Sequence, residues 1–238
     1  MRYIEHLIEP ERLLLSWQAL DSNSRSRYLV GELVRKDDVV VLNYFKGTED
    51  FEQARLQGFK GHPAFQLKDD VCSYENQVLE AFTHRIPPRS RSDFYRYLEL
   101  RGLNPDAAIS DFALLGYVGA RLPDDGFELV HPFDSANEPF ELLIEVAGFR
   151  YESTISIDEI AVNTPVQFIP EPENQYDSQA IRIELGGNKL GYVDRGRLEL
   201  FHRHLKAGHS VQGEVIRKNG TAERPLLYIY TTIAPNRH

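Results

Sequence analysis

The first 130 residues alternate between short apolar runs that are typical of strands and longer amphipathic stretches that are typical of helices. Three strand-like runs come first, separated by polar residues: "LLLSWQAL", "RYLVGELVR" and "VVVLNYF". The polar "RKDD" between the last two predicts a hairpin. Helices are predicted in "TEDFEQARLQGF" with Thr48 as N-cap, in "SYENQVLEAFTHRI", in "RSDFYRYLELRGL" and after Ser110 in "SDFALLGYVG". A turn and a short strand follow in "ARLPDDGFELV".

The pattern changes at residues 131–140, "HPFDSANEPF", which hold two prolines and no periodicity, as a linker does. Six strand candidates follow: "LLIEVAGF", "TPVQFIP", "AIRIEL", "KLGYVD", "SVQGEVIRK" and "PLLYIYTTI". One helix, "RGRLELFHRHLKAG", lies among them and is predicted to end near Gly208. Five or six short strands and one helix in about 100 residues indicate a small barrel, of which the OB-like fold is one type.

We therefore expect an α+β protein of two domains. A mixed β-sheet and helical module occupies residues 1–135, and a small OB-like β-barrel with one helix occupies residues 141–238. Length and composition agree with this, because 238 residues with 42% hydrophobic and 26% charged side chains are ordinary for globular domains.

Composition also limits the setting of the protein. No apolar run approaches the roughly 20 residues that a membrane helix needs, and the N-terminus lacks a secretory signal pattern. The single Cys72 cannot form an internal disulfide or a cysteine zinc site, which favours a reducing cytoplasmic compartment. We expect no membrane association.

The net charge of −9 argues against general coating of nucleic acid, because non-specific binding depends on basic surface. The charge is unevenly distributed. From Glu141 onward the chain has 11 Lys and Arg against 13 Asp and Glu, whereas the first 140 residues have 16 against 23. The C-terminal part is thus nearly neutral and can carry a local basic patch, while the N-terminal part repels a polyanion.

Enzyme signatures are lacking in the chain, which has no GxxxxGK, GxSxG, HExxH or CxxC motif. His202 and His204 are two apart on a predicted helix, so they point to different faces, and we interpret them as exposed rather than as a metal pair. We expect no catalytic residues, no metal and no cofactor. A cryptic nuclease or other hydrolase is the weakest alternative.

The densest polar stretch is "EPENQYDSQA" (171–180), which separates two predicted strands. Pro172 and Asn174 explain a turn, but a turn does not need the large side chain of Tyr176. An earlier segment, "GFRYES", places Arg150 and Tyr151 after another strand. If the two segments meet, two aromatic faces can sandwich a base and an arginine can meet a phosphate. From the residues alone, a well-made turn is the alternative.

Three blocks in this order, "VAGFRY", "FIPEPENQYDSQAIRI" and "KLGYVDR", resemble the HIRAN domain, and the resemblance covers about residues 141–235. It implies an OB-like module that grips the 3′-hydroxyl end of single-stranded DNA. It assigns DNA-binding roles to Arg150, Tyr151, Asn174, Tyr176, Asp177, Tyr192 and Arg195.

By this resemblance, Tyr151 and Tyr176 stack on the terminal bases, and Asp177 accepts a hydrogen bond from the 3′ hydroxyl. Arg150 and Asn174 hold the last nucleotide, Arg195 occupies the place of a basic phosphate contact, and Tyr192 takes a flanking position. Gln175 departs from the family pattern, since many members have proline there.

The N-terminal half resembles the N-terminal module of HipA-type toxin kinases over about residues 13–130. The resemblance rests on "GELVRKDDVVVLNYF", "GFKGHPAF", "FTHRIPPRSRSDFYRYLELRGL" and "DFALLGYVGARLP". The kinase core of that family, with its ATP loop and catalytic aspartate, has no counterpart here, so no kinase activity is expected. The resemblance suggests a docking role toward a protein partner.

Our leading hypothesis is a non-enzymatic protein that binds single-stranded DNA 3′ ends through the barrel and docks a partner through the acidic N-terminal module. Analogy suggests a bacterial DNA repair, defence or toxin–antitoxin setting. The alternative is a protein-interaction module that regulates a kinase-like toxin and does not bind DNA.

Overall fold

The computed structural model describes residues 2–20, 26–136 and 138–234, which form two compact units. The N-terminal unit comprises Ile8–Arg101 and Pro105–Ser135. The barrel unit comprises Met1–Leu7, Gly102–Asn104 and Ala136–His238. The expected division into domains 1–135 and 141–238 stays a prediction.

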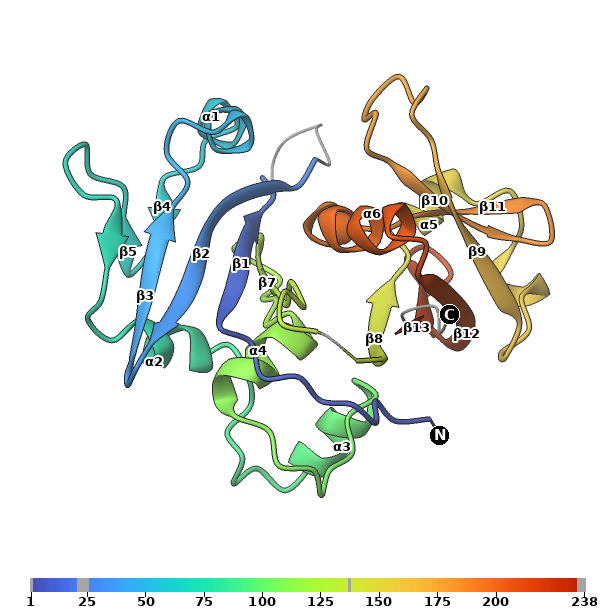
Figure 1. Ribbon diagram of the computed structural model, residues 1–238, viewed down its shortest axis with the longest axis horizontal. Helices are drawn as coiled ribbons and strands as arrows, with labels where there is room; N and C mark the ends of the chain where they lie inside the picture. The colour runs from blue at the N-terminus through green and yellow to red at the C-terminus, as the bar shows by residue number, and fades with distance from the viewer. Residues whose placement is uncertain (1, 21–25, 137, 235–238) are drawn as a thin grey trace. The chain divides into compact units, whose positions relative to one another are not determined.

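The N-terminal unit is built on a five-stranded antiparallel sheet in the order β6-β3-β2-β1-β7 (Figure 1). Its strands are β1 (Arg12–Trp17), β2 (Tyr28–Lys36), β3 (Val39–Tyr44), β6 (Ser73–Tyr74) and β7 (Phe127–Val130). A small separate hairpin is formed by β4 (Gly61–His62) and β5 (Phe65–Gln66). The helices are α1 (Glu49–Leu56), α2 (Val78–Thr83), α3 (Phe94–Glu99) and α4 (Asp111–Val118).

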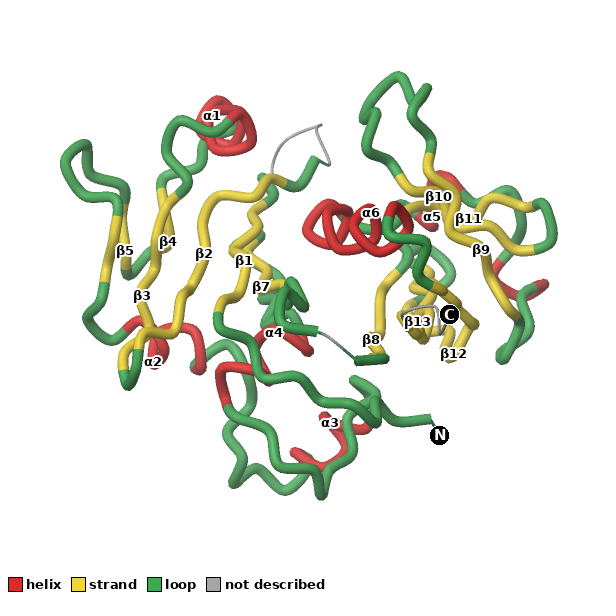
Figure 2. The backbone as a smooth tube through the Cα atoms, in the orientation of Figure 1, coloured by secondary structure: helices red, strands yellow, loops and turns green. Residues whose placement is uncertain are grey.

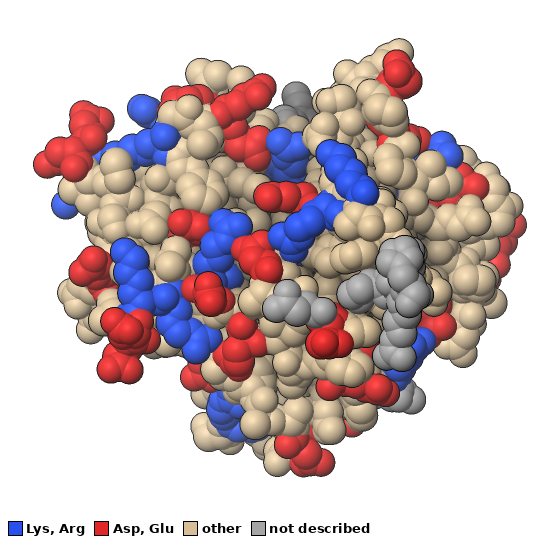
Figure 3. Space-filling model, in the orientation of Figure 1, with Lys and Arg blue, Asp and Glu red and all other residues tan. Residues whose placement is uncertain are grey.

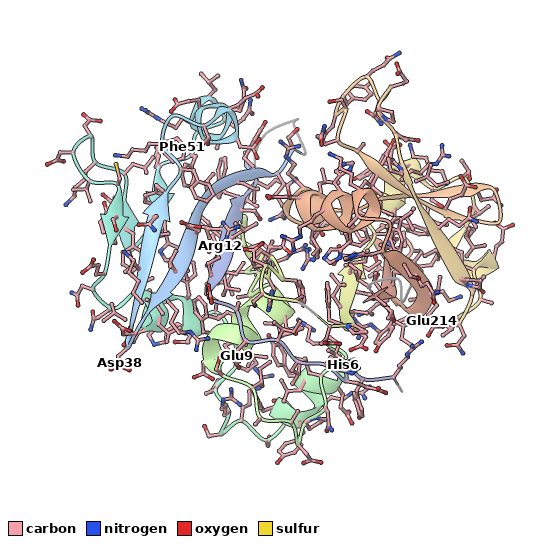
Figure 4. All side chains as sticks on the ribbon, viewed as in Figure 1. His6, Glu9, Arg12, Asp38, Phe51 and Glu214 are labelled. Atoms are coloured by element: carbon pink, nitrogen blue, oxygen red, sulfur yellow. The ribbon has the colours of Figure 1, made fainter. Side chains whose placement is uncertain are left out.

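The local signals in this unit act as the sequence predicts. β2 and β3 form the hairpin expected at "RKDD", with Lys36 opposite Val39 and Asp38 at its tip (Figure 4). Thr48 caps α1 by accepting a hydrogen bond from the backbone N–H of Phe51 at 3.4 Å. Ser110 caps α4 in the same way, with Ala113 as the donor at 3.0 Å.

One expected helix is shorter than predicted. Its first residues, Ser73 and Tyr74, are the strand β6 instead, which pairs with Asn43 and Leu42 of β3. The sheet satisfies their backbone groups, so the helix begins only at Val78. Val78 and Phe82 of α2 are buried in the core of the unit.

The barrel unit has all six expected strands, in the order β11-β10-β9-β12-β13-β8. They are β8 (Phe140–Glu145), β9 (Pro165–Pro170), β10 (Ile181–Leu185), β11 (Asn188–Tyr192), β12 (Ser210–Gly220) and β13 (Pro225–Ala234). The expected helix is α6 (Leu198–Lys206), which packs Phe201 on Phe168 of β9 with 4.9 Å between ring centroids. The α+β fold class is confirmed.

Within the described residues, one isolated bridge joins the two ends of this sheet. Ala147, just after β8, donates to the carbonyl of Tyr192 at 2.8 Å, and Tyr192 donates back to Ala147 at 2.9 Å. Gly191 makes this approach possible, because its φ is +147° and a Cβ there would lie 2.4 Å from the Ala147 carbonyl oxygen. The bridge therefore closes the sheet into a barrel.

The barrel unit also contains short helical segments besides α6. The segment Arg195–Arg197 begins the helix that the sequence predicts, and the other segments were not predicted. α5 (Phe149–Glu152) is a single turn that starts after Gly148, whose φ is +74°. The 3₁₀ turns η1 (Ile157–Glu159) and η2 (Arg195–Arg197) complete the unit. Figure 2 labels α5 among the strands and loops of this unit.

One expectation for α6 is wrong. His204 is buried rather than exposed, against the ring of Phe140, and its Nδ1 lies 2.9 Å from Nδ1 of His209. Burial, with smaller contributions from Arg203 and His209, lowers the pKa of His204 to about 4. The helix turns this side chain toward the barrel because it lies three residues after Phe201.

Candidate nucleic-acid interface

The segment 171–180 is the loop between β9 and β10 (Figure 2). Its base is held by a hydrogen bond from the backbone N–H of Glu171 to the carbonyl of Ala180 at 2.8 Å. Two turns shape the rest: Asn174 donates to the carbonyl of Glu171 at 3.0 Å, and Ala180 donates to that of Asp177 at 2.9 Å. The loop is therefore an ordered turn, as its Pro and Asn residues predict.

The side chain of Asn174 determines the shape of this loop. Its Oδ1 accepts from the backbone N–H groups of Tyr176 at 3.0 Å and Asp177 at 3.2 Å. Its Nδ2 donates to Glu171 Oε2 at 3.0 Å and to Tyr192 Oη at 3.1 Å. A side-chain amide has two N–H donors and two acceptor lone pairs, so these four bonds use its full capacity. A nucleotide contact at Asn174 would have to replace one of them.

The side chain of Asp177 is less fully occupied by hydrogen bonds than that of Asn174. One of its carboxylate oxygens, Oδ1, accepts from the backbone N–H of Gln179 at 2.8 Å, and the other, Oδ2, lies 3.1 Å from Nη1 of Arg195. An ionised carboxylate has about four acceptor positions, so this one retains acceptor capacity. Both side chains are about one-third exposed, at 35% and 36%. The acid on the loop and the guanidinium of η2 thus form a partly exposed ion pair.

Two exposed tyrosines lie on the two segments of interest. Tyr176 on the loop is 99% exposed, and Tyr151 on α5 is 52% exposed. The guanidinium of Arg150 lies 5.0 Å from the centroid of the Tyr151 ring, within cation–π range. Aromatic rings that are left in water on a folded protein are candidates for stacking against a ligand.

A chain of side-chain hydrogen bonds joins α5 to the loop through β11. Lys189 Nζ donates to Glu152 of α5 and, at 2.8 Å, to the phenol oxygen of Tyr192. The Tyr192 hydroxyl in turn donates to Glu171 Oε2 at 3.1 Å. The two segments that the sequence analysis paired are therefore linked by Glu152, Lys189, Tyr192 and Glu171.

Glu171 is the central acceptor of this chain, and the sequence analysis gave it no role. Besides Asn174 and Tyr192, it accepts from Arg182 Nη1 at 2.9 Å. Burial alone would raise its pKa, but hydrogen bonds from Asn174 and Tyr192 and the charges of Arg182 and Lys189 hold that pKa below the usual value. The sequence places Glu171 directly after one predicted strand and Arg182 within the next, which was the available signal.

The charges around the site are balanced rather than basic. Arg182, Lys189 and Arg195 each form an ion pair with a nearby acid. The face of the molecule in Figure 3 likewise mixes Lys and Arg with Asp and Glu. Polyanion attraction alone would therefore be weak here.

Among residues 2–20, 26–136 and 138–234, no group of three or more His, Cys, Asp or Glu side chains is arranged to hold a metal ion. Over the same residues, none of the helices combines the length and the apolar character needed to cross a bilayer.

Comparisons with known proteins bear on the barrel unit. Of the solved structures, the chain is similar to the HIRAN domain of human HLTF, with 21% identity and a TM-score of 0.31 over 40% of this chain and 75% of that one. It is also similar to a protein from Lactobacillus plantarum, with 22% identity and a TM-score of 0.35 over 41% of this chain and 99% of that one. No curated protein matches the chain.

For the N-terminal unit, the comparisons give no support to the HipA-type resemblance, which stays a prediction. For the barrel unit, the family model of the HIRAN domain matches residues 139–232. This span includes α5, the loop 171–180 and every side chain of the linking chain. Residues 139–232 therefore match the HIRAN domain, and this match indicates a DNA-binding module.

Proposed function

We propose that the barrel unit binds the 3′-hydroxyl end of single-stranded DNA, with the loop 171–180 and α5 as the two sides of its site. The observation that carries the proposal is the ion pair of Asp177 and Arg195, together with the fully exposed side chain of Tyr176, the residue before Asp177. A carboxylate with unused acceptor positions favours a hydroxyl donor and repels a 3′ phosphate. The adjacent guanidinium compensates for the charge of the acid near the DNA backbone.

The remaining groups have distinct roles in this proposal. Tyr176 and Tyr151 stack on the last bases, because a base–aromatic contact suits any sequence. Arg150 contacts a phosphate from the side of α5. Asn174 and Tyr192 contribute by holding the loop, since both are occupied by bonds within the protein.

Fluorescence anisotropy with a 5′-labelled single-stranded oligonucleotide tests this function. The same oligonucleotide is prepared with a 3′ hydroxyl and with a 3′ phosphate, and the two dissociation constants are compared. We expect the hydroxyl end to bind at least about tenfold more tightly, the value of one charged hydrogen bond. Equal affinity for the two ends, or no binding at low salt, would contradict the proposal.

We also propose that the acidic N-terminal unit docks a protein partner, on the basis of the excess of Asp and Glu in the first 140 residues. Such a surface favours a basic partner and a salt-sensitive complex. Co-purification with a partner that persists in a Tyr176→Ala variant, and that is lost at high salt, would support docking. If that variant binds its partner normally and the wild type binds no DNA, the proposal of DNA-end binding is rejected in favour of the protein-interaction alternative.

A further inference from the structure

We propose that Glu171 is the positioning residue of the DNA-end site, because its carboxylate orients the side chains of Asn174 and Tyr192. Asn174 in turn fixes the turn that presents Asp177, and Tyr192 fixes the helix that carries Tyr151. The inference rests on the proposed function. It assigns to Glu171 no contact with DNA. Its effect on binding is transmitted by the groups that it holds.

The first step concerns the orientation of the Asn174 amide. Because Glu171 Oε2 takes a hydrogen from Nδ2 at 3.0 Å, the oxygen of the amide has to face the other way. There it accepts from the N–H groups of Tyr176 and Asp177. A flipped amide would bring its NH₂ hydrogens against these two N–H groups and would leave all of them unpaired. The carboxylate therefore selects the one orientation that stabilises the turn.

The second step concerns the phenol of Tyr192. An ionised carboxylate only accepts, so the single Tyr192 hydrogen goes to Glu171, at 3.1 Å. The two lone pairs of the phenol oxygen then accept from Asn174 at 3.1 Å and from Lys189 at 2.8 Å. The capacity of this hydroxyl is fully used, and the direction of every bond around it follows from the charge on Glu171.

The third step extends the effect to α5. Lys189 is positioned by Tyr192 and also donates to Glu152, the neighbour of Tyr151 in α5. The ammonium also lies 4.3 Å from the centroid of the Tyr192 ring, which restricts it further. The loop and α5 are thus coupled through one carboxylate, and a change at Glu171 should affect both sides of the site.

Glu173 provides a matched control in the same loop. It is exposed, and within the described residues its side chain forms no hydrogen bond or ion pair of the kind that surrounds Glu171. Glu171→Gln and Glu173→Gln remove the same charge two residues apart. If charge alone mattered, both variants would bind DNA slightly more tightly, because each removes a repulsion toward phosphate.

The experiment compares these two variants with the wild-type chain in two measurements. The first is the ratio of dissociation constants for the 3′-phosphate and 3′-hydroxyl oligonucleotides. The second, on the protein without DNA, is the NMR exchange rate of the backbone amides of Tyr176 and Asp177. For Glu171→Gln we expect the ratio to fall about tenfold and both amides to exchange several-fold faster. For Glu173→Gln we expect neither to change.

A Glu171→Gln variant with an unchanged ratio and unchanged amide exchange would overturn the inference. If the wild type binds neither oligonucleotide, the proposed function fails, and the amide exchange still shows whether Glu171 holds the turn. If Glu171→Gln does not fold, Tyr192→Phe removes the shared hydroxyl and should change both measurements in the same direction. No effect of Tyr192→Phe on either one would then overturn the inference.

Discussion

Nη1 of Arg195 lies 3.1 Å from Oδ2 of Asp177, so the acid proposed for the 3′ hydroxyl and the arginine predicted to meet a phosphate are partners in the free protein. A DNA end that engages both has to share or replace this ion pair. Because the pair is partly exposed, opening it costs little, about 1 kcal/mol or less. The two charged groups of the proposed site are therefore already adjacent in the free protein, and their ion pair can open when DNA binds.

Asp177→Asn tests the origin of the end preference. The amide oxygen can still accept from Gln179 and from a hydroxyl, but the negative charge that repels a 3′ phosphate is gone. We expect the preference for the hydroxyl end to fall at least about tenfold, mainly through tighter binding of the phosphate end. Anisotropy with both oligonucleotides measures this, and an unchanged preference would remove Asp177 from end recognition.

Tyr176→Ala should weaken binding of single-stranded DNA by about 1–3 kcal/mol, the usual value of one stacked base. Because the ring is 99% exposed, its removal should leave the thermal midpoint within about 1 °C of wild type, since surface substitutions change stability little. Tyr176→Phe keeps the stacking face and serves as the control. Equal losses for Ala and Phe would show that the hydroxyl, not the ring, is what matters.

Arg150→Met should reduce the salt dependence of DNA binding by about one phosphate contact, while keeping a long side chain over Tyr151. The measurement is the slope of log affinity against log salt concentration, obtained with the 3′-hydroxyl oligonucleotide. Lys206→Met on α6 is the control, since Lys206 is exposed and lies outside the proposed site. A smaller slope for both variants would indicate a general charge effect instead of a contact at Arg150.

Much of the fold follows from local patterns, and the site follows from them only in part. The caps at Thr48 and Ser110 and the six barrel strands could be predicted because their signals lie within a few residues. β6 could not, because its partner β3 lies about 30 residues earlier in the chain. α5 could not either, since one helical turn shows no periodicity.

The role of Glu171 shows the same limit at the site. Its turn bond with Asn174 is local, and Arg182 lies in the next predicted strand. Its bond with Tyr192 depends on where β11 lies in the barrel, which the sequence pattern does not determine. The residues of the site were therefore easier to predict than the contacts that organise them.

Gly191→Ala should prevent the barrel from closing. A Cβ at this position would lie 2.4 Å from the carbonyl oxygen of Ala147, so the bridge between Ala147 and Tyr192 would have to open. We expect a loss of at least about 3 kcal/mol in the free energy of unfolding, from the clash, the backbone strain and two lost hydrogen bonds. Gly187→Ala is the control, since its φ is also positive but no atom lies within 4 Å of the added Cβ. Gly187→Ala should lower the free energy of unfolding by only about 1–2 kcal/mol. If urea denaturation gives equal losses for the two variants, the broken bridge is not the cause of the loss in Gly191→Ala.

Acid should destabilise the barrel unit through His204. Its pKa is about 4 in the folded protein because the ring is buried, against about 6.5 in the unfolded chain. The unfolded chain therefore binds a proton more readily, so stability is at its full value above about pH 6.5 and falls as the pH drops toward about 4. Burial also gives His62 in the N-terminal unit a pKa of about 4, so His62 causes a similar loss of stability in acid. The His204→Gln variant keeps that contribution. Urea denaturation of wild type and His204→Gln from pH 7.5 to 4.5 separates the two contributions. We expect the loss of stability on acidification to be smaller in the variant. An equal loss in the two proteins would show that His204 takes up its proton without cost to the fold.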